Sequence, residues 1–220
     1  MTVKRAFDLA ASALALALLA IPLLLVALLV KLSSRGPALF VQERIGRDGV
    51  PFRLYKVRTM GVTDRGPSIT VDGDLRVTRV GRFLRRWKLD ELPQLWNVLR
   101  GDMSIIGPRP EAEKFVRCYR EAERRVLRAA PGLAGMAALI YPDEGEILRA
   151  QPDADAAYVE HLMPRKLAVE LEYEARRTFA SDLGLMLKLA LSIAGSRKYA
   201  DREFRIDASA HRPVQLESII

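Results

Sequence analysis

An apolar run near the start of the chain dominates its hydrophobic pattern. Residues 10–30 carry no charged side chain and a single hydroxyl, that of Ser12. As a helix, this run would be about 31 Å long, close to the thickness of the hydrocarbon core of a bilayer. It is longer than the apolar part of a typical signal peptide, and Lys31 follows it directly in place of a small-residue cleavage site. The pattern therefore predicts a membrane helix within residues 1–35.

Two features favour a helix that enters and leaves the same face of the membrane. Pro22 lies inside the run, where it removes a backbone hydrogen bond and can kink the helix. Basic residues also flank both ends, with Lys4 and Arg5 before the run and Lys31 after it. Basic residues prefer the cytoplasmic side, so neither end is a natural outside end. From the residues alone, a re-entrant helix bent at Pro22 is favoured and a straight span stays open.

The remaining pattern predicts a mainly helical domain over residues 36–195 and a polar, loosely ordered tail over 196–220. Alternating apolar positions within residues 38–60 predict a β-hairpin, and residues 61–74 predict a mobile loop. Helical spacing predicts helices over 77–87, 89–100, 111–130, 164–178 and 183–194. Ser181 or Asp182 is the expected cap of the last helix, which can lie on the membrane or in the core. The expected fold class is α+β.

Composition and charge exclude several classes of protein. The 220 residues contain one cysteine, which rules out a disulfide-stapled domain, and two histidines without ligand spacing, which argues against structural zinc. The formal net charge is +8. Such a charge suits nucleic acid, anionic lipid head groups or a phosphate-rich substrate, and does not choose among them.

The candidate chemistry lies between residues 79 and 110. Asp90 and Glu91 stand side by side where a helix is expected to begin, since Pro93 is tolerated only in a first turn. Arg85 precedes them, and Arg109 follows between two prolines. Nearby cations and a helix N-terminus keep a carboxylate ionised. Such an aspartate can cap a helix, bind a divalent cation or attack phosphorus, and spacing alone favours the cap. Arg109 is harder to explain as a solvated side chain, because its prolines hold it rigidly.

The chain resembles a known family, the bacterial sugar transferases that act as monotopic polyprenyl-phosphate phosphoglycosyl transferases. The matching motifs are KRAFDLAAS at residues 4–12, GPALFVQERIGRDGVPF at 36–52, YKVRTM at 55–60, RVTRVGRFLRRWKLDELPQLWNVLRGDMSIIGPRP at 76–110 and PGLAG at 131–135. They occur in family order across about residues 4–195. Ile21 departs from the serine that many members carry before the helix-breaking proline.

The resemblance implies a reaction and roles for individual residues. It implies transfer of a sugar-1-phosphate from a UDP-sugar to polyprenyl phosphate with release of UMP, through a Mg²⁺-dependent covalent intermediate. By position, Asp90 would be the nucleophile and a Mg²⁺ ligand, and Glu91 its partner. Basic residues would bind the nucleotide or its phosphates, and Pro22 would break a re-entrant helix. These basic residues are Arg58, Arg85, Arg109 and, as a weaker candidate, Lys56.

The resemblance also implies a place and partners. The enzyme would sit on the bacterial inner membrane with its catalytic domain on the cytoplasmic face, and would start glycoconjugate assembly. Its partners would be the UDP-sugar donor, the polyprenyl phosphate acceptor and membrane lipid, without nucleic acid. The sugar and the presence of a homo-oligomer stay open. The alternative is a membrane-tethered basic binding protein, or an inactive scaffold.

Overall fold

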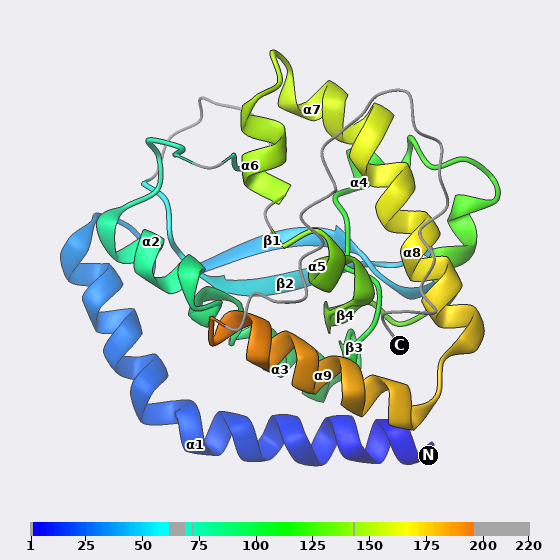
Figure 1. Ribbon diagram of the computed structural model, residues 1–220. Helices are drawn as coiled ribbons and strands as arrows, with labels where there is room; N and C mark the ends of the chain where they lie inside the picture. The colour runs from blue at the N-terminus through cyan, green and yellow to red at the C-terminus, as the bar shows by residue number, and fades with distance from the viewer. Residues whose placement is uncertain (1, 62–68, 72, 143, 196–220) are drawn as a thin grey trace.

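The computed structural model describes residues 2–61, 69–71, 73–142 and 144–195. Most of the predicted loop over 61–74 and the whole predicted tail over 196–220 lie outside the described residues. Figure 1 shows one long helix, α1 (Val3–Ser33), along the edge of a mainly helical body that surrounds a β-hairpin. Among the described residues, α1 is the one helix long and apolar enough to cross a membrane, with a mean hydropathy of 3.0.

Helix α1 bends between two arms that follow two sides of the body (Figure 1). Pro22 lies inside this helix, and a proline is a common cause of such a bend because it removes one backbone hydrogen bond. The first arm packs along α3 (Gln94–Arg100), and the second arm reaches α2 (Arg79–Arg86). Most of the large apolar side chains of α1 remain exposed, including Leu18, Ile21 and Leu24.

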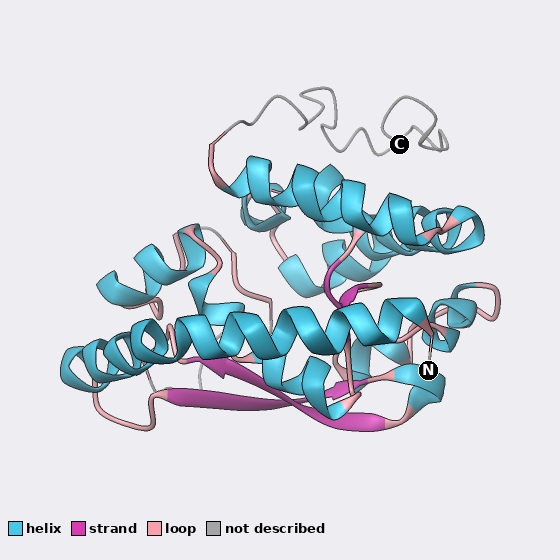
Figure 2. Cartoon of the chain, turned by 90° about the horizontal axis from the view of Figure 1, so that it is seen from below, coloured by secondary structure: helices cyan, strands magenta, loops and turns pink. Residues whose placement is uncertain are grey.

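The predicted hairpin is confirmed. Strands β1 (Leu39–Ile45) and β2 (Pro51–Val57) pair antiparallel, with Leu39 opposite Val57 and Ile45 opposite Pro51. A short 3-10 turn, η1 (Arg47–Gly49), joins them, and Asp48 and Gly49 both have positive φ. Figure 2 shows the two strands as a twisted ribbon running beneath the helices.

A second strand pair was not predicted from the sequence. Strands β3 (Ser104–Ile106) and β4 (Gly132–Ala134) pair in parallel. They were not predicted because each is too short to show an alternating pattern. Their close approach requires glycine, because a Cβ on Gly132 would lie 2.2 Å from the backbone nitrogen of Gly107. This pair fixes the start of the Pro108–Pro110 segment, which carries Arg109.

The predicted single helix over 111–130 is wrong. The structure has two short helices there, α4 (Glu113–Val116) and the 3-10 segment η3 (Glu123–Arg128). The side chain of Glu123 accepts a hydrogen bond from the backbone nitrogen of Arg120 at 2.7 Å, which gives this backbone group a partner in the turn between the two segments. Phe115, Tyr119 and Val126 can then all turn into the same core.

The last two helices agree better with their predictions, whereas the short helices before residue 163 were not predicted. Helices α5 (Met136–Ile140), α6 (Glu144–Arg149) and α7 (Ala154–Ala157) lead through a π-helical turn, η4 (Tyr158–Leu162), into α8 (Met163–Arg176). Helix α9 (Phe179–Ile193) begins earlier than predicted. Thr178 caps it in a capping box with Ser181, so neither Ser181 nor Asp182 is the N-cap.

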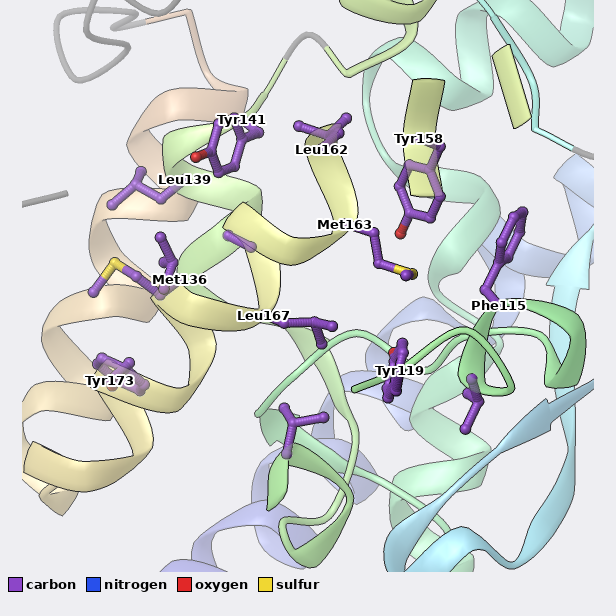
Figure 3. Packing of buried hydrophobic residues seen from close by; sticks show 14 of the residues in the cluster. Phe115, Tyr119, Met136, Leu139, Tyr141, Tyr158, Leu162, Met163, Leu167 and Tyr173 are labelled. Carbon is purple, nitrogen blue, oxygen red and sulfur yellow. The ribbon is translucent and has the colours of Figure 1, made fainter. Parts of the chain in front are cut away.

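The main hydrophobic core lies between α4, α5, α8 and β3. Figure 3 shows side chains from these elements meeting there, among them Phe115, Met136, Met163 and Tyr173. A smaller cluster joins Val30 of α1, Val57 of β2 and Leu84 of α2. Through this cluster the second arm of α1 is part of the folded domain.

Candidate functional site

Asp90 and Glu91 lie in a 3-10 turn between two helices. Helix α2 ends at Arg86, and Lys88 then adopts a left-handed conformation with φ of 54°. The 3-10 turn η2 (Leu89–Glu91) follows, and α3 begins at Gln94, after Pro93. The predicted helix over 89–100 is therefore correct in its second half, and its predicted start near Asp90 is a tighter turn.

The two carboxylates are buried in different surroundings. Asp90 is 7% exposed, and its Oδ1 atom has no hydrogen-bond partner. Glu91 is 9% exposed and is held by two cations. Its Oε1 atom lies 2.5 Å from Nη2 of Arg109 and 3.1 Å from Nζ of Lys56. A second contact, from Nη1 of Arg109 to Oε2 of Glu91 at 3.4 Å, makes the Arg109–Glu91 ion pair bidentate.

These surroundings move the two pKa values in opposite directions. Burial alone would raise the pKa of Glu91, but the charges of Arg109 and Lys56 outweigh it and hold that pKa well below its usual range. Burial, followed by the negative charge of Glu91, raises the pKa of Asp90. The sequence led us to expect cations to keep Asp90 ionised. The charges of Lys56 and Arg85 do act in that direction, but burial is the larger effect.

The pKa values of Lys56 and Arg109 also shift in this cluster. Burial lowers the pKa of Lys56, and the charge of Arg109 lowers it further, while Glu91 opposes both. The charge of Glu91 raises the pKa of Arg109. The side chain of Arg109 remains 40% exposed, so its guanidinium can meet a soluble ligand while it contacts Glu91.

Arg85 approaches the pair from the end of α2. Its Nε atom donates to the hydroxyl of Thr59 at 2.8 Å, and its charge acts on Asp90. Gly81 lets α2 lie this close, because a Cβ there would lie 2.0 Å from the carbonyl oxygen of Thr59. Neither Thr59 nor Gly81 was predicted from the sequence, since neither has a recognisable chemical role on its own.

Arg58 is placed differently from the other predicted basic residues. It is 6% exposed, and its guanidinium donates to backbone carbonyls of residues 34–37, where α1 leads into β1. The structure therefore brings Asp90, Glu91, Lys56, Arg85 and Arg109 together, and it holds the Arg58 side chain at the end of the membrane-length helix.

Asn97 is a further residue whose role was not predicted from the sequence. It is fully buried in α3, its side-chain oxygen accepts from the backbone nitrogen of Tyr55 at 3.2 Å, and its amide donates to the carbonyl of Arg53 at 2.7 Å. These bonds tie α3 to β2, the strand that carries Lys56. A polar residue in a short helix gives no sign from sequence that it is a tether.

The described residues contain no group of three or more histidine, cysteine, aspartate or glutamate side chains that could hold a metal ion. A Mg²⁺ ion does not need such a group when its ligands include substrate phosphates, because one or two carboxylates are then enough. The unpartnered Oδ1 of Asp90 is a hard oxygen that fits this requirement. The residues present are therefore compatible with the predicted cation.

Fold and site together define a domain with a membrane-length apolar helix and a buried aspartate–glutamate pair surrounded by cations. Comparison with known families makes this class specific. The family model described as bacterial sugar transferase matches residues 1–195. The chain belongs to the bacterial sugar transferase family, as its motifs indicated.

Several curated proteins are similar to this chain. A UDP-N-acetylgalactosamine-undecaprenyl-phosphate N-acetylgalactosaminephosphotransferase of Aeromonas hydrophila is 38% identical over 191 residues, which cover 83% of this chain and 44% of that protein. UDP-glucose:undecaprenyl-phosphate glucose-1-phosphate transferases of Caulobacter vibrioides and Escherichia coli are 47% and 48% identical over 167 and 139 residues. These matches cover 71% and 61% of this chain, and 62% and 30% of the relatives. The chain therefore spans only part of the length of these relatives.

Proposed function

We propose that this protein transfers a sugar-1-phosphate from a UDP-sugar to polyprenyl phosphate, with undecaprenyl phosphate as the acceptor, and releases UMP. Its family and the names of its relatives support this reaction class. The observation that carries the proposal is the pairing of a buried Asp90, whose Oδ1 has no partner, with a Glu91 already neutralised by two cations. This reaction would start the assembly of a glycoconjugate.

The reaction proceeds in two displacements at phosphorus. A carboxylate oxygen of Asp90 attacks the phosphorus that bears the sugar, and the bond from that phosphorus to the bridging oxygen breaks, so that UMP leaves with the bond's electrons. A phosphate oxygen of the polyprenyl acceptor then attacks the same phosphorus. The bond to Asp90 breaks, the carboxylate is regenerated, and a polyprenyl diphosphate sugar is formed.

The cations around Asp90 support both displacements. Arg109 is exposed enough to bind a donor phosphate and to stabilise charge on the transferring group. Arg85 approaches Asp90 from the end of α2. Lys56 lowers the pKa of Asp90, which favours the nucleophilic carboxylate. Glu91 holds Lys56 and Arg109 in place. In this pair of carboxylates, the neighbouring groups give each a different role.

A Mg²⁺ ion completes the proposed site. Asp90 would hold it together with oxygens of the donor diphosphate, and the bound ion would neutralise charge that develops on those oxygens. We expect chelation with excess EDTA to abolish UMP release, and restored Mg²⁺ to recover it. Full release in the presence of chelator would contradict this part of the proposal.

We further propose that α1 is re-entrant and that the domain lies on the cytoplasmic face of the inner membrane. Arg5, near the start of α1, donates to the backbone carbonyl oxygens of Val98 and Leu99 at 2.6 and 3.1 Å. Val30, near the end of α1, packs with Val57 and Leu84 in the same domain. A straight span would separate the two ends by about 30 Å of hydrocarbon, so one end would lose its contacts.

Covalent trapping tests the catalytic proposal. Protein in its membrane is mixed with Mg²⁺ and UDP-sugars labelled with radioactive phosphorus next to the sugar, without acceptor. We expect label on the protein, none with Asp90→Asn, and normal labelling with Asp48→Asn, an exposed aspartate at the hairpin turn. Equal labelling of the Asp90→Asn variant would remove Asp90 from its role. Absence of label and of UMP release across a panel of UDP-sugars would favour the binding or scaffold protein instead.

A further inference from the structure

Four consecutive backbone carbonyls surround one buried guanidinium at the end of α1. Arg58 donates from Nε to the oxygen of Pro37 at 2.6 Å and from Nη1 to that of Arg35 at 2.7 Å. Its Nη2 atom donates to the oxygens of Ser34 at 3.0 Å and Gly36 at 3.4 Å. The backbone nitrogen of Arg58 also donates to the oxygen of Ala38 at 2.8 Å.

These hydrogen bonds place the guanidinium of Arg58 in a structural role and not in a ligand-binding one. All three guanidinium nitrogens donate to protein oxygens, and the residue is 6% exposed. The carbonyls lie just beyond Ser33, the last residue of α1, where the helix dipole favours a cation. The planar fork of arginine reaches several oxygens at once, which a lysine ammonium cannot do.

The strand end around Arg58 also links α1 to the catalytic pair. Lys56 contacts Glu91, and Val57 packs against Val30 of α1. Thr59 accepts the hydrogen bond from Arg85. Lys56 and Thr59 thus contact the catalytic side, and Val57 and Arg58 between them contact the membrane-helix side. Figure 1 shows the second arm of α1 rising beside α2 toward this segment.

We propose that Arg58 is a positioning residue that locks the exit of the membrane helix to the catalytic domain, and so sets where Asp90 stands relative to the membrane surface. This inference rests on the proposed function for its kinetic consequence only. The soluble donor reaches the site from water, whereas the acceptor phosphate is held at the bilayer. Loss of the lock therefore affects acceptor use more than donor use.

Limited proteolysis tests the lock without any substrate. Arg35 is exposed and lies within the clamped linker, so trypsin can cut after it once the linker opens. With protein in membrane vesicles, we expect Arg58→Gln to speed cleavage after Arg35 by about tenfold or more, because a buried charged hydrogen-bond network is lost. Arg53→Gln is the matched control, since Arg53 is an exposed arginine on β2, the strand that ends just before Arg58, and its cleavage rate should equal that of the unaltered protein.

Kinetics then separate positioning from donor binding. For Arg58→Gln we expect the burst of UMP and the donor KM to stay within about twofold, while steady-state transfer to polyprenyl phosphate falls about tenfold. Arg58→Lys should behave like Arg58→Gln, because charge without the fork cannot hold four carbonyls. It also provides a second variant if the glutamine substitution prevents folding.

Two results would overturn the inference. One is unchanged cleavage after Arg35 in both Arg58 variants. The other is a donor KM that rises in Arg58→Gln and recovers in Arg58→Lys, which would mean that Arg58 binds the diphosphate through its charge. A protein that releases no UMP at all would refute the proposed function, and the proteolysis comparison would still decide whether Arg58 is a lock.

Discussion

Glu170 is a buried carboxyl group whose charge should cost stability. It is 4% exposed in α8, and its Oε1 atom accepts from the backbone nitrogen of Ala137 at 2.9 Å, in the first turn of α5. Its Oε2 atom has no partner. Burial raises the pKa of Glu170 to about 7, and the hydrogen bond from Ala137 opposes this only in part.

The pKa difference gives the sign and the size of the effect. The unfolded chain loses this proton near pH 4.5 and the folded protein near pH 7. Between these values the folded state binds more protons, so stability falls as pH rises and reaches its lowest level above pH 7. At 1.36 kcal/mol per pKa unit, the loss amounts to about 3 kcal/mol.

The substitution Glu170→Gln keeps an oxygen for the amide of Ala137 and removes the ionisation. Calorimetry in lipid nanodiscs from pH 5 to 8.5 should show a melting temperature that falls with pH in the unaltered protein and stays level in the variant. The variant should melt higher at pH 8 by about 6–12 °C. Glu121→Gln, at an exposed site, is the control and should follow the unaltered protein. Parallel curves for the unaltered protein and the Glu170→Gln variant would refute the reasoning.

Three further predictions follow from single contacts. Gly81→Ala places a Cβ 2.0 Å from the oxygen of Thr59, so we expect α2 to shift and UMP release to fall at least tenfold, measured against the melting temperature of the same protein. Lys56→Met removes a charge that lowers the pKa of Asp90, so the acid limb of the pH–rate profile should move to higher pH; a limb that stays in place would contradict the assignment. Asp8→Ala removes a buried carboxylate that joins the first arm of α1 to β3, and it should speed tryptic cleavage near the N-terminus, which protease mapping by mass spectrometry would detect.

Local patterns predicted the elements whose signal lies within a few residues. The apolar run predicted a membrane-length helix, alternation predicted the hairpin, and Pro164 marked the start of α8 within one residue. The motif between residues 76 and 110 indicated the family, which the family model confirms. These features depend on periodicity or on residue identity, and both can be read without knowledge of distant contacts.

Tertiary contacts decided what the sequence left open. The segment over 111–130 looked like one amphipathic helix, yet it folds as α4 and η3 because Phe115 and Val126 reach the same core. Burial determined that the pKa of Asp90 rises while that of Glu91 falls, and no spacing rule contains this information.

Arg58 shows the same limit most clearly. Its motif grouped it with the basic residues of the site, and the fold placed its guanidinium on the carbonyls at the end of α1. The sequence by itself determined the membrane helix, the hairpin and the carboxylate pair with its basic neighbours. Only the tertiary structure decided which cation meets which oxygen, because such pairing depends on side chains brought together from distant parts of the chain.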